Sequence, residues 1–207
     1  MTATSFPALS CPELTPGEIA KASRYLIQTR DALLESVTGL SAAQWEFKPA
    51  PDRWSIAEVL EHIILVETAI LHNVRATIEA PLAPPEWEPS RTDDFIVTQV
   101  PMRTRYADRQ GPPKFTAPPQ LCPTGRWSTT EAVAIFLDRR EQNLQMLNPG
   151  LVRGRVISHP ALGPWDGYQW LLAAGSHCSR HTAQIREVKE EPDFPSTTGV
   201  ASALAIH

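Results

Sequence analysis

The segment HCSRHTAQI places two histidines, His177 and His181, four positions apart. Residues at positions i and i+4 lie side by side on one face of an α-helix, so both imidazoles can reach the same point in space. Neutral imidazole is a common ligand of zinc and of other divalent transition metals. The spacing therefore predicts a metal site on a helix, and the alternative is a pair of core histidines that hydrogen bond to protein acceptors.

The residues around this pair indicate which way the two rings point. With about 100° of rotation per residue, His181 lies roughly 40° and Trp170 roughly 20° from His177, in the same apolar stripe as Ile185. Two neutral rings without partners in a core would cost on the order of a few kcal/mol, and two protonated rings would repel each other. A shared metal ion removes both costs.

A third ligand is expected from another helix. The six histidines of the chain are His62, His72, His159, His177, His181 and His207. His62 borders the apolar arc of the helix expected after Ser55, whereas His72 falls on its opposite, solvent-facing side. Three histidines from two helices leave coordination positions open for water or substrate, which is typical of catalytic sites. We therefore predict that His62, His177 and His181 hold a divalent metal ion.

Glu67 lies within the same apolar arc as His62, where packing alone does not account for a carboxylate. A buried carboxylate needs a partner. It can orient a ligand histidine, bind the metal or act as a base near it, or it can pair with an arginine away from the site. Glu67 is predicted as a catalytic residue, and the arginine pair is the alternative.

Other chemistries fit the sequence less well. Di-iron bundles use Glu-x-x-His motifs, whereas Val59 and Cys178 occupy the corresponding positions before His62 and His181. The chain also lacks a G-x-S-x-G elbow, a phosphate-binding glycine loop and an H-E-x-x-H motif. A thiolate–imidazole pair of Cys178 with His181 is a minor alternative, because a cysteine in an apolar stripe is more often a small core residue.

Length and composition predict a single domain, and the absence of targeting signals predicts that it is cytoplasmic. A chain of 207 residues with 42% hydrophobic residues can bury one substantial core, which we place in residues 1–191. The net charge of −4 argues against nucleic acid or an anionic membrane as partners. No signal-peptide pattern or membrane-length apolar run is present, and the three cysteines form no disulfide or zinc-knuckle pattern and are expected to be reduced.

Four long helices must position these residues. Helical periodicity and N-cap signals place them at about residues 15–38, 55–78, 128–148 and 166–190. Three of them open with a capping-box pattern, at Thr15, Ser55 and Ser128. Ten prolines between positions 81 and 123 predict a stiff crossover over residues 82–127, in which FIVTQV could form one extended piece. We expect an all-α four-helix bundle without a sheet, followed by a C-terminal tail at 192–207.

Two stretches of the sequence resemble the signature segments of the DinB/YfiT-like superfamily of metal-dependent hydrolases and thiol S-transferases. They are PDRWSIAEVLEHIILVE, at 51–67, and HPALGPWDGYQWLLAAGSHCSRHTAQI, at 159–185. The resemblance implies a four-helix bundle of that type, a homodimer, and a divalent metal bound by three histidines that correspond to His62, His177 and His181. Zinc or nickel is the expected metal, with iron or manganese as alternatives. His159 matches the turn before the last helix, where it would fix the loop.

Some relatives in that superfamily use the metal to activate a low-molecular-weight thiol such as bacillithiol, mycothiol or glutathione for transfer to an electrophile. We therefore expect a metal-dependent enzyme that activates a thiol or water for transfer to, or hydrolysis of, a small electrophilic substrate. The competing hypothesis is a non-catalytic, metal-stabilised bundle that acts as a protein-interaction or stress-response module. An open polar cavity above the metal would favour the enzyme, and a cavity plugged by side chains would favour the module.

Overall fold

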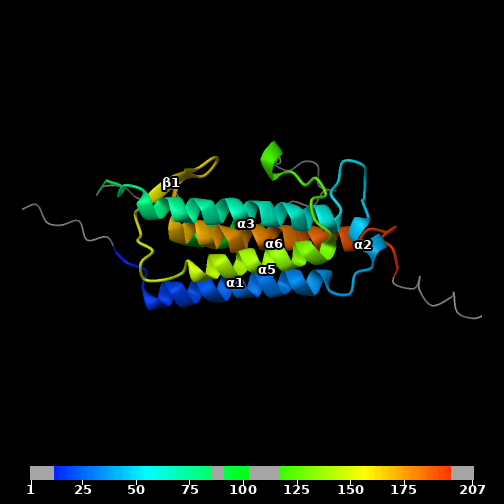
Figure 1. The fold of residues 1–207 in the computed structure, drawn as a ribbon, viewed down its shortest axis with the longest axis horizontal. Coiled ribbons are helices and arrows are strands. Elements are labelled where there is room, and N and C mark those ends of the chain that lie inside the picture. The colour runs from blue at the N-terminus through cyan, green and yellow to red at the C-terminus, as the bar shows by residue number, and fades with distance from the viewer. Residues whose placement is uncertain (1–11, 85–90, 103–116, 197–207) are drawn as a thin grey trace, which may run out of the picture.

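The computed structural model describes residues 12–84, 91–102 and 117–196. Four long helices dominate this part of the chain and lie side by side (Figure 1). They are α1 (Pro16–Val37), α3 (Ile56–Glu79), α5 (Thr129–Gln145) and α6 (Gly167–Lys189). The shorter elements are α2 (Ala42–Glu46), α4 (Asp93–Thr98), the 3-10 helix η1 (Pro119–Leu121) and the strands β1 (Val156–His159) and β2 (Gly163–Asp166).

The long helices begin where their capping signals predict. Thr15, Ser55 and Ser128 each accept a hydrogen bond from a backbone N–H three residues on, and the glutamate at that position accepts one in return. Asp166 caps α6 through the N–H of Gln169. These local bonds set the residue at which each helix starts. The local sequence therefore places His62 within α3 and His177 within α6.

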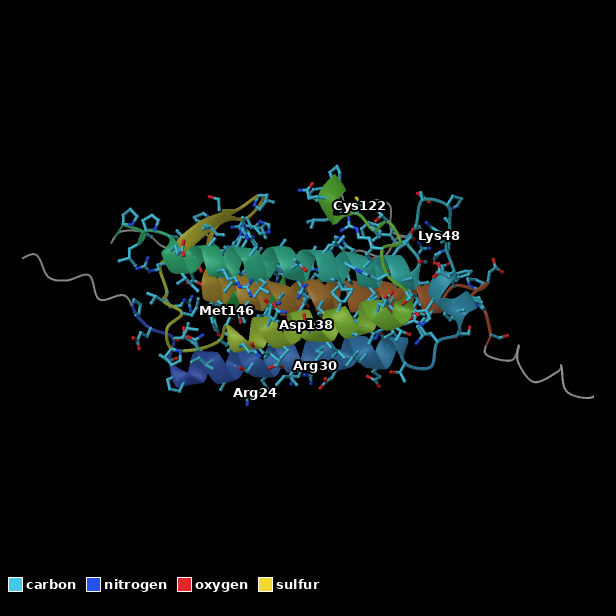
Figure 2. All side chains as sticks on the ribbon, in the orientation of Figure 1. Arg24, Arg30, Lys48, Cys122, Asp138 and Met146 are labelled. Atoms are coloured by element: carbon cyan, nitrogen blue, oxygen red, sulfur yellow. The ribbon has the colours of Figure 1, made fainter. Side chains whose placement is uncertain are left out.

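The helices pack in a cyclic order, with α3 against α6, α6 against α1, α1 against α5, and α5 against α3. Gly175 allows the close approach of α1 and α6, because a Cβ at this position would lie 2.7 Å from Cε1 of Tyr25. Exposed charged side chains such as Arg24 on α1 and Asp138 on α5 cover the outer surface (Figure 2). The contact of α3 with α6 brings together the helices that carry His62 and His177.

Three local elements differ from the expectations. FIVTQV is not extended, because Thr92 caps the helix α4 by accepting from the N–H of Phe95. Residues 156–166 form an antiparallel hairpin, so the chain is mostly but not entirely helical, and Gly163 supplies the positive φ of 85° that the turn needs. The short helix α2, capped by Ser41, was not expected.

The described pieces of the 82–127 crossover lie against the long helices. The helix α4 packs on α6, and η1 packs on α3. Residues 85–90 and 103–116 of the crossover, and residues 197–207 of the tail, lie outside the described part of the chain. The division into one domain and a tail stays a prediction. Within the described residues, no helix is long and apolar enough to cross a membrane.

Candidate metal centre

The structure brings His62 of α3 together with His177 and His181 of α6. Each offers one ring nitrogen as a ligand atom, and these atoms all lie within 4.8 Å of one another. The ring centroids of His62 are 5.0 Å from His177 and 4.7 Å from His181, and the latter two are 4.3 Å apart. The three histidines singled out by the sequence therefore form one cluster between two packed helices.

His62 has a defined tautomer in this cluster. Its Nδ1 lies 2.7 Å from the carbonyl oxygen of Leu121, and because a carbonyl can only accept, Nδ1 must carry the proton and donate. The other nitrogen, Nε2, then has a free lone pair, and it lies 3.2 Å from Nε2 of His177. The ring of Trp54, at a centroid distance of 4.8 Å, covers another side of His62. Nε2 is thus directed at the other histidines.

The two histidines of α6 differ in their second nitrogen. Nδ1 of His181 lies 2.8 Å from Oε1 of Gln184, an acceptor that holds the proton on Nδ1. His177 is partly exposed, but its Nδ1 is buried and has no hydrogen-bond partner among the described residues. Both imidazoles can present Nε2 to His62, but of the two only His181 has an acceptor for its Nδ1 proton among the residues that the structure describes.

This donor set fits a divalent metal ion. Two nitrogens bound to zinc at about 2.0–2.1 Å in tetrahedral geometry lie about 3.3–3.4 Å apart, close to the 3.2 Å between Nε2 of His62 and Nε2 of His177. Burial lowers the pKa of His62, and burial together with the charges of His181 and His62 lowers the pKa of His177 well below its usual value. Both shifts favour the neutral form of these two rings, which is the form that binds metals.

Glu67 lies elsewhere in the core, in an ion pair with Arg140 of α5. Both side chains are fully buried. Nε of Arg140 donates to both oxygens of Glu67 at 3.2 Å, Nη2 donates to Oε1, and Asn143 donates to Oε2 at 3.2 Å. Burial disfavours the guanidinium charge, but the charges and hydrogen bonds of Glu67 and Cys178 together outweigh this and raise the pKa of Arg140 above its usual value. Glu67 is not part of the histidine cluster, and the arginine pair is the observed partner; its catalytic role stays a prediction.

The other histidines do not join the cluster. His72 is exposed on α3, as expected, and His207 lies outside the described residues. Nδ1 of His159 accepts hydrogen bonds from the N–H groups of Ala161 and Leu162, both at 3.1 Å, so His159 fixes the hairpin turn. Its ring packs at a tilt of 38° against that of Trp165, with the centroids 4.3 Å apart, and burial lowers the pKa of His159 to about 4.

The cysteines offer no activated thiol at the cluster. Cys178 is buried, its Sγ donates to the carbonyl of Thr29 at 3.4 Å, and burial raises its pKa to about 11. That shift opposes thiolate formation, so a pair with His181 is not supported. Cys122 follows η1 over α3 (Figure 2) and is a free thiol, whereas Cys11 lies beyond the described range.

Glu61 is a buried acidic residue next to His62 that the sequence did not single out. Its carboxylate accepts hydrogen bonds from the N–H groups of Thr124 at 2.9 Å, Gly125 at 2.8 Å and Arg126 at 3.3 Å. These partners are backbone groups of a loop more than sixty residues away, so neither periodicity nor spacing points to them. Glu61 therefore ties α3 to the loop that leads into α5.

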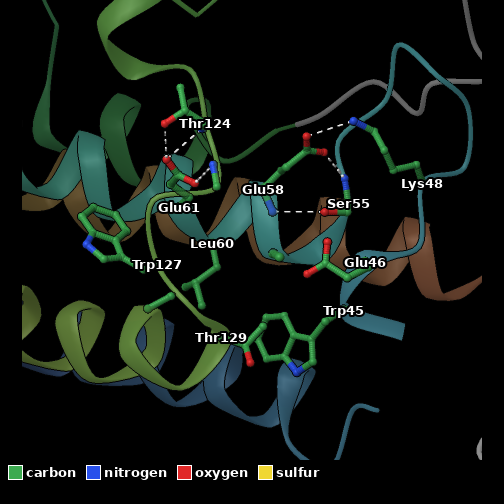
Figure 3. Close-up of a pocket in the computed structure, with 13 residues that line it drawn as sticks. Trp45, Glu46, Lys48, Ser55, Glu58, Leu60, Glu61, Thr124, Trp127 and Thr129 are labelled. Atoms are coloured by element: carbon green, nitrogen blue, oxygen red, sulfur yellow. Dashed lines mark hydrogen bonds and ion pairs between the residues drawn. The ribbon is translucent and has the colours of Figure 1, made fainter. Parts of the chain in front are cut away.

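Glu61 also borders a cavity of about 510 Å³, seen in Figure 3. Leu60, Trp127 and Trp45 supply apolar walls, and the Lys48–Glu58 ion pair lies at its edge. None of the three clustered histidines lines this cavity. The cavity is therefore separate from the histidine cluster.

Comparisons with known proteins place these features in a family. The family model of the DinB superfamily matches residues 25–185, a range that contains all three clustered histidines. The uncharacterized protein YuaE of Bacillus subtilis (strain 168) is 27% identical over 157 residues, which cover 74% of this chain and 88% of that protein. No solved structure gives a significant match. Because the family model spans most of the chain, from α1 to α6, the protein belongs to the DinB superfamily.

Proposed function

We propose that His62, His177 and His181 hold one divalent metal ion, and that the protein is a metal-dependent enzyme acting on a small electrophilic molecule. The observation that carries this proposal is the convergence of three imidazoles from two helices, with Nε2 of His62 3.2 Å from Nε2 of His177. A divalent ion bound there would lower the pKa of a thiol or water and so supply a nucleophile at neutral pH.

The charges of the chain's own residues favour an anionic nucleophile at this site. Three neutral imidazoles leave the positive charge of a divalent ion uncompensated, because the cluster found in the described part of the chain contains no carboxylate. The charge of Arg180, which lowers the pKa of His177, adds to the positive potential. A thiolate or hydroxide is therefore stabilised there relative to its protonated form. His177 is partly exposed, unlike the buried His62 and His181, so we take access of a small molecule to the ion to be from the side of His177.

The finer family features belong to the same proposal. We infer that the four long helices form the bundle typical of the superfamily, and that the protein acts as a homodimer in the cytoplasm. The non-catalytic alternative is that the ion only ties α3 to α6, whose contact already contains all three histidines.

Cobalt substitution tests whether the site accepts a nucleophile. The protein would be loaded with Co²⁺, and glutathione, mycothiol or bacillithiol would be added while the absorption spectrum is recorded. We expect a sulfur-to-cobalt charge-transfer band if a thiol binds, and its loss in His177→Ala. A response to azide but to no thiol would favour the hydrolase. A spectrum that stays unchanged with every added ligand, despite full cobalt loading, would refute the enzyme and favour the stabilised module.

A further inference from the structure

Glu61 and His62 are neighbours in α3, and both bind the same short segment of chain. His62 Nδ1 donates to the carbonyl of Leu121 at 2.7 Å. The carboxylate of Glu61 accepts from the backbone N–H groups of Thr124 and Gly125, beside it in Figure 3, and from that of Arg126. The segment from Leu121 to Arg126 is therefore attached to α3 at two points, and one of them is a metal-ligand candidate.

The attachment through Glu61 is the stronger of the two. The residue is only 4% exposed, so its carboxylate is largely shielded from water and is stabilised mainly by the N–H groups of the loop. Gly125 has a φ of 74°, a left-handed conformation that turns successive N–H groups toward one anion. The Nε of Arg126 lies 3.4 Å from the same carboxylate and adds an opposite charge at its exposed edge.

We propose that Glu61 is a positioning residue for His62. By holding the loop at 124–126, it keeps the carbonyl of Leu121 over Nδ1, which keeps the proton on that nitrogen and leaves Nε2 for the metal. Hydrogen bonds of this kind orient a ligand imidazole and increase its basicity. The inference rests on the proposed function, since it takes His62 to be a metal ligand. The acceptor is the backbone carbonyl of Leu121, which a substitution cannot remove. The side chain of Glu61, which holds the loop, can be substituted instead.

The direct test is Glu61→Gln. Glutamine keeps the shape, but it loses the charge and puts an NH₂ group against backbone N–H donors. We expect zinc affinity, measured by competition with a chromophoric chelator, to fall by about 10-fold to 100-fold. In the zinc-free protein, ¹⁵N NMR of the ring nitrogens should show His62 change from one Nδ1–H tautomer to a mixture. Glu58→Gln removes a charge from the same helix, where the carboxylate binds Ser55 and Lys48 instead, and should leave both readouts unchanged.

A second pair of variants perturbs the loop without touching α3. Gly125 and Gly39 have φ values of 74° and 75°, and an added Cβ would meet no atom within 4 Å at either site. Alanine therefore imposes a similar backbone strain at both positions. Gly125→Ala should weaken zinc binding and alter the His62 tautomer, whereas Gly39→Ala, in the turn after α1, should change neither.

A folded Glu61→Gln protein with wild-type zinc affinity and a single Nδ1–H tautomer on His62 would overturn the proposal. If Glu61→Gln does not fold, the Gly125→Ala and Gly39→Ala pair decides, and equal behaviour of the two would reject it. If the wild type binds no zinc, the proposed function fails, but the tautomer comparison in the zinc-free protein still tests Glu61. The two failures are therefore distinguishable.

Discussion

The variant Glu67→Gln separates a structural role for Glu67 from a role at the metal. Glutamine keeps the size of the side chain but removes the charge that faces Arg140, and both residues are fully buried. Removing one partner of a buried ion pair typically costs about 3–5 kcal/mol, because the other charge is left uncompensated. Arg140 would keep two neutral acceptors, the carbonyl of Leu26 at 2.5 Å and Oγ1 of Thr29 at 2.8 Å.

Because Arg140 keeps these two acceptors, we expect the loss of stability to lie near the lower end of that range. We predict that the free energy of unfolding falls by about 3 kcal/mol, which corresponds to a decrease in Tm of about 6–12 °C for a chain of this length. Urea unfolding followed by circular dichroism measures the first quantity, and a thermal scan measures the second. Zinc affinity should be unchanged, because Glu67 is outside the histidine cluster. Glu141→Gln, an exposed site on α5, is the control and should be neutral.

The opposite pattern would refute this reasoning. A Glu67→Gln protein with wild-type stability, and with zinc affinity or turnover reduced by about 10-fold to 100-fold, would show that Glu67 serves the metal site as the sequence predicted. A loss of both stability and zinc affinity would indicate that the ion pair also sets the position of α3.

Two further predictions concern metal and pH. Zinc at about 100 times its Kd should stabilise the folded protein by about 2.7 kcal/mol, and chelator should reverse the effect, because an ion at the proposed site would bridge α3 and α6. Stability should also fall as the pH decreases from about 6.5 toward 4, since the folded state keeps His159 neutral, with a pKa of about 4, while the unfolded state binds the proton. Urea midpoints measured across this range should depend less on pH in His159→Gln.

A specific result would contradict each of the metal and pH predictions. A Tm that does not move after metal removal has been verified would argue against an ion that bridges the two helices. For His159, the two proteins would have to be compared in the same buffers. An unchanged slope of stability against pH in His159→Gln would show that other groups, and not this imidazole, cause the acid sensitivity.

The histidine cluster could be predicted because its residues obey local rules. His177 and His181 are linked by helical spacing alone, and His62 follows from its place beside an apolar arc. Capping residues such as Ser55 and Ser128 accept a hydrogen bond from the backbone N–H three residues on, so the helix starts could also be predicted from the sequence. The contact of α3 with α6 then follows from burying both apolar faces.

The elements that were missed have weak or conflicting signals in the sequence. The helix α4 was obscured by a proline-rich context, although Thr92 and the acidic first turn after it are capping signals. The hairpin at 156–166 has strands of only four residues and no clear alternation. Glu61 was missed because its partners are backbone groups, and a backbone N–H has no signature in the sequence.

The choice between two roles for Glu67 illustrates the same limit. Its position in an apolar arc correctly indicated a buried carboxylate that needs a partner. The partner, Arg140, lies 73 residues away on another helix. Periodicity shows which face of a helix is buried, but it does not show which residue of another helix lies opposite. The three-dimensional arrangement was needed to identify the ion pair.

Metal content is the most direct test of the central claim, that His62, His177 and His181 form a metal site. Wild type, His181→Ala and the control His72→Ala, an exposed histidine on α3, would be stripped with a mild chelator, reloaded with zinc and analysed by elemental mass spectrometry. We predict about one zinc per chain in the wild type and in His72→Ala, and little or none in His181→Ala. Equal zinc content in wild type and His181→Ala would contradict the account.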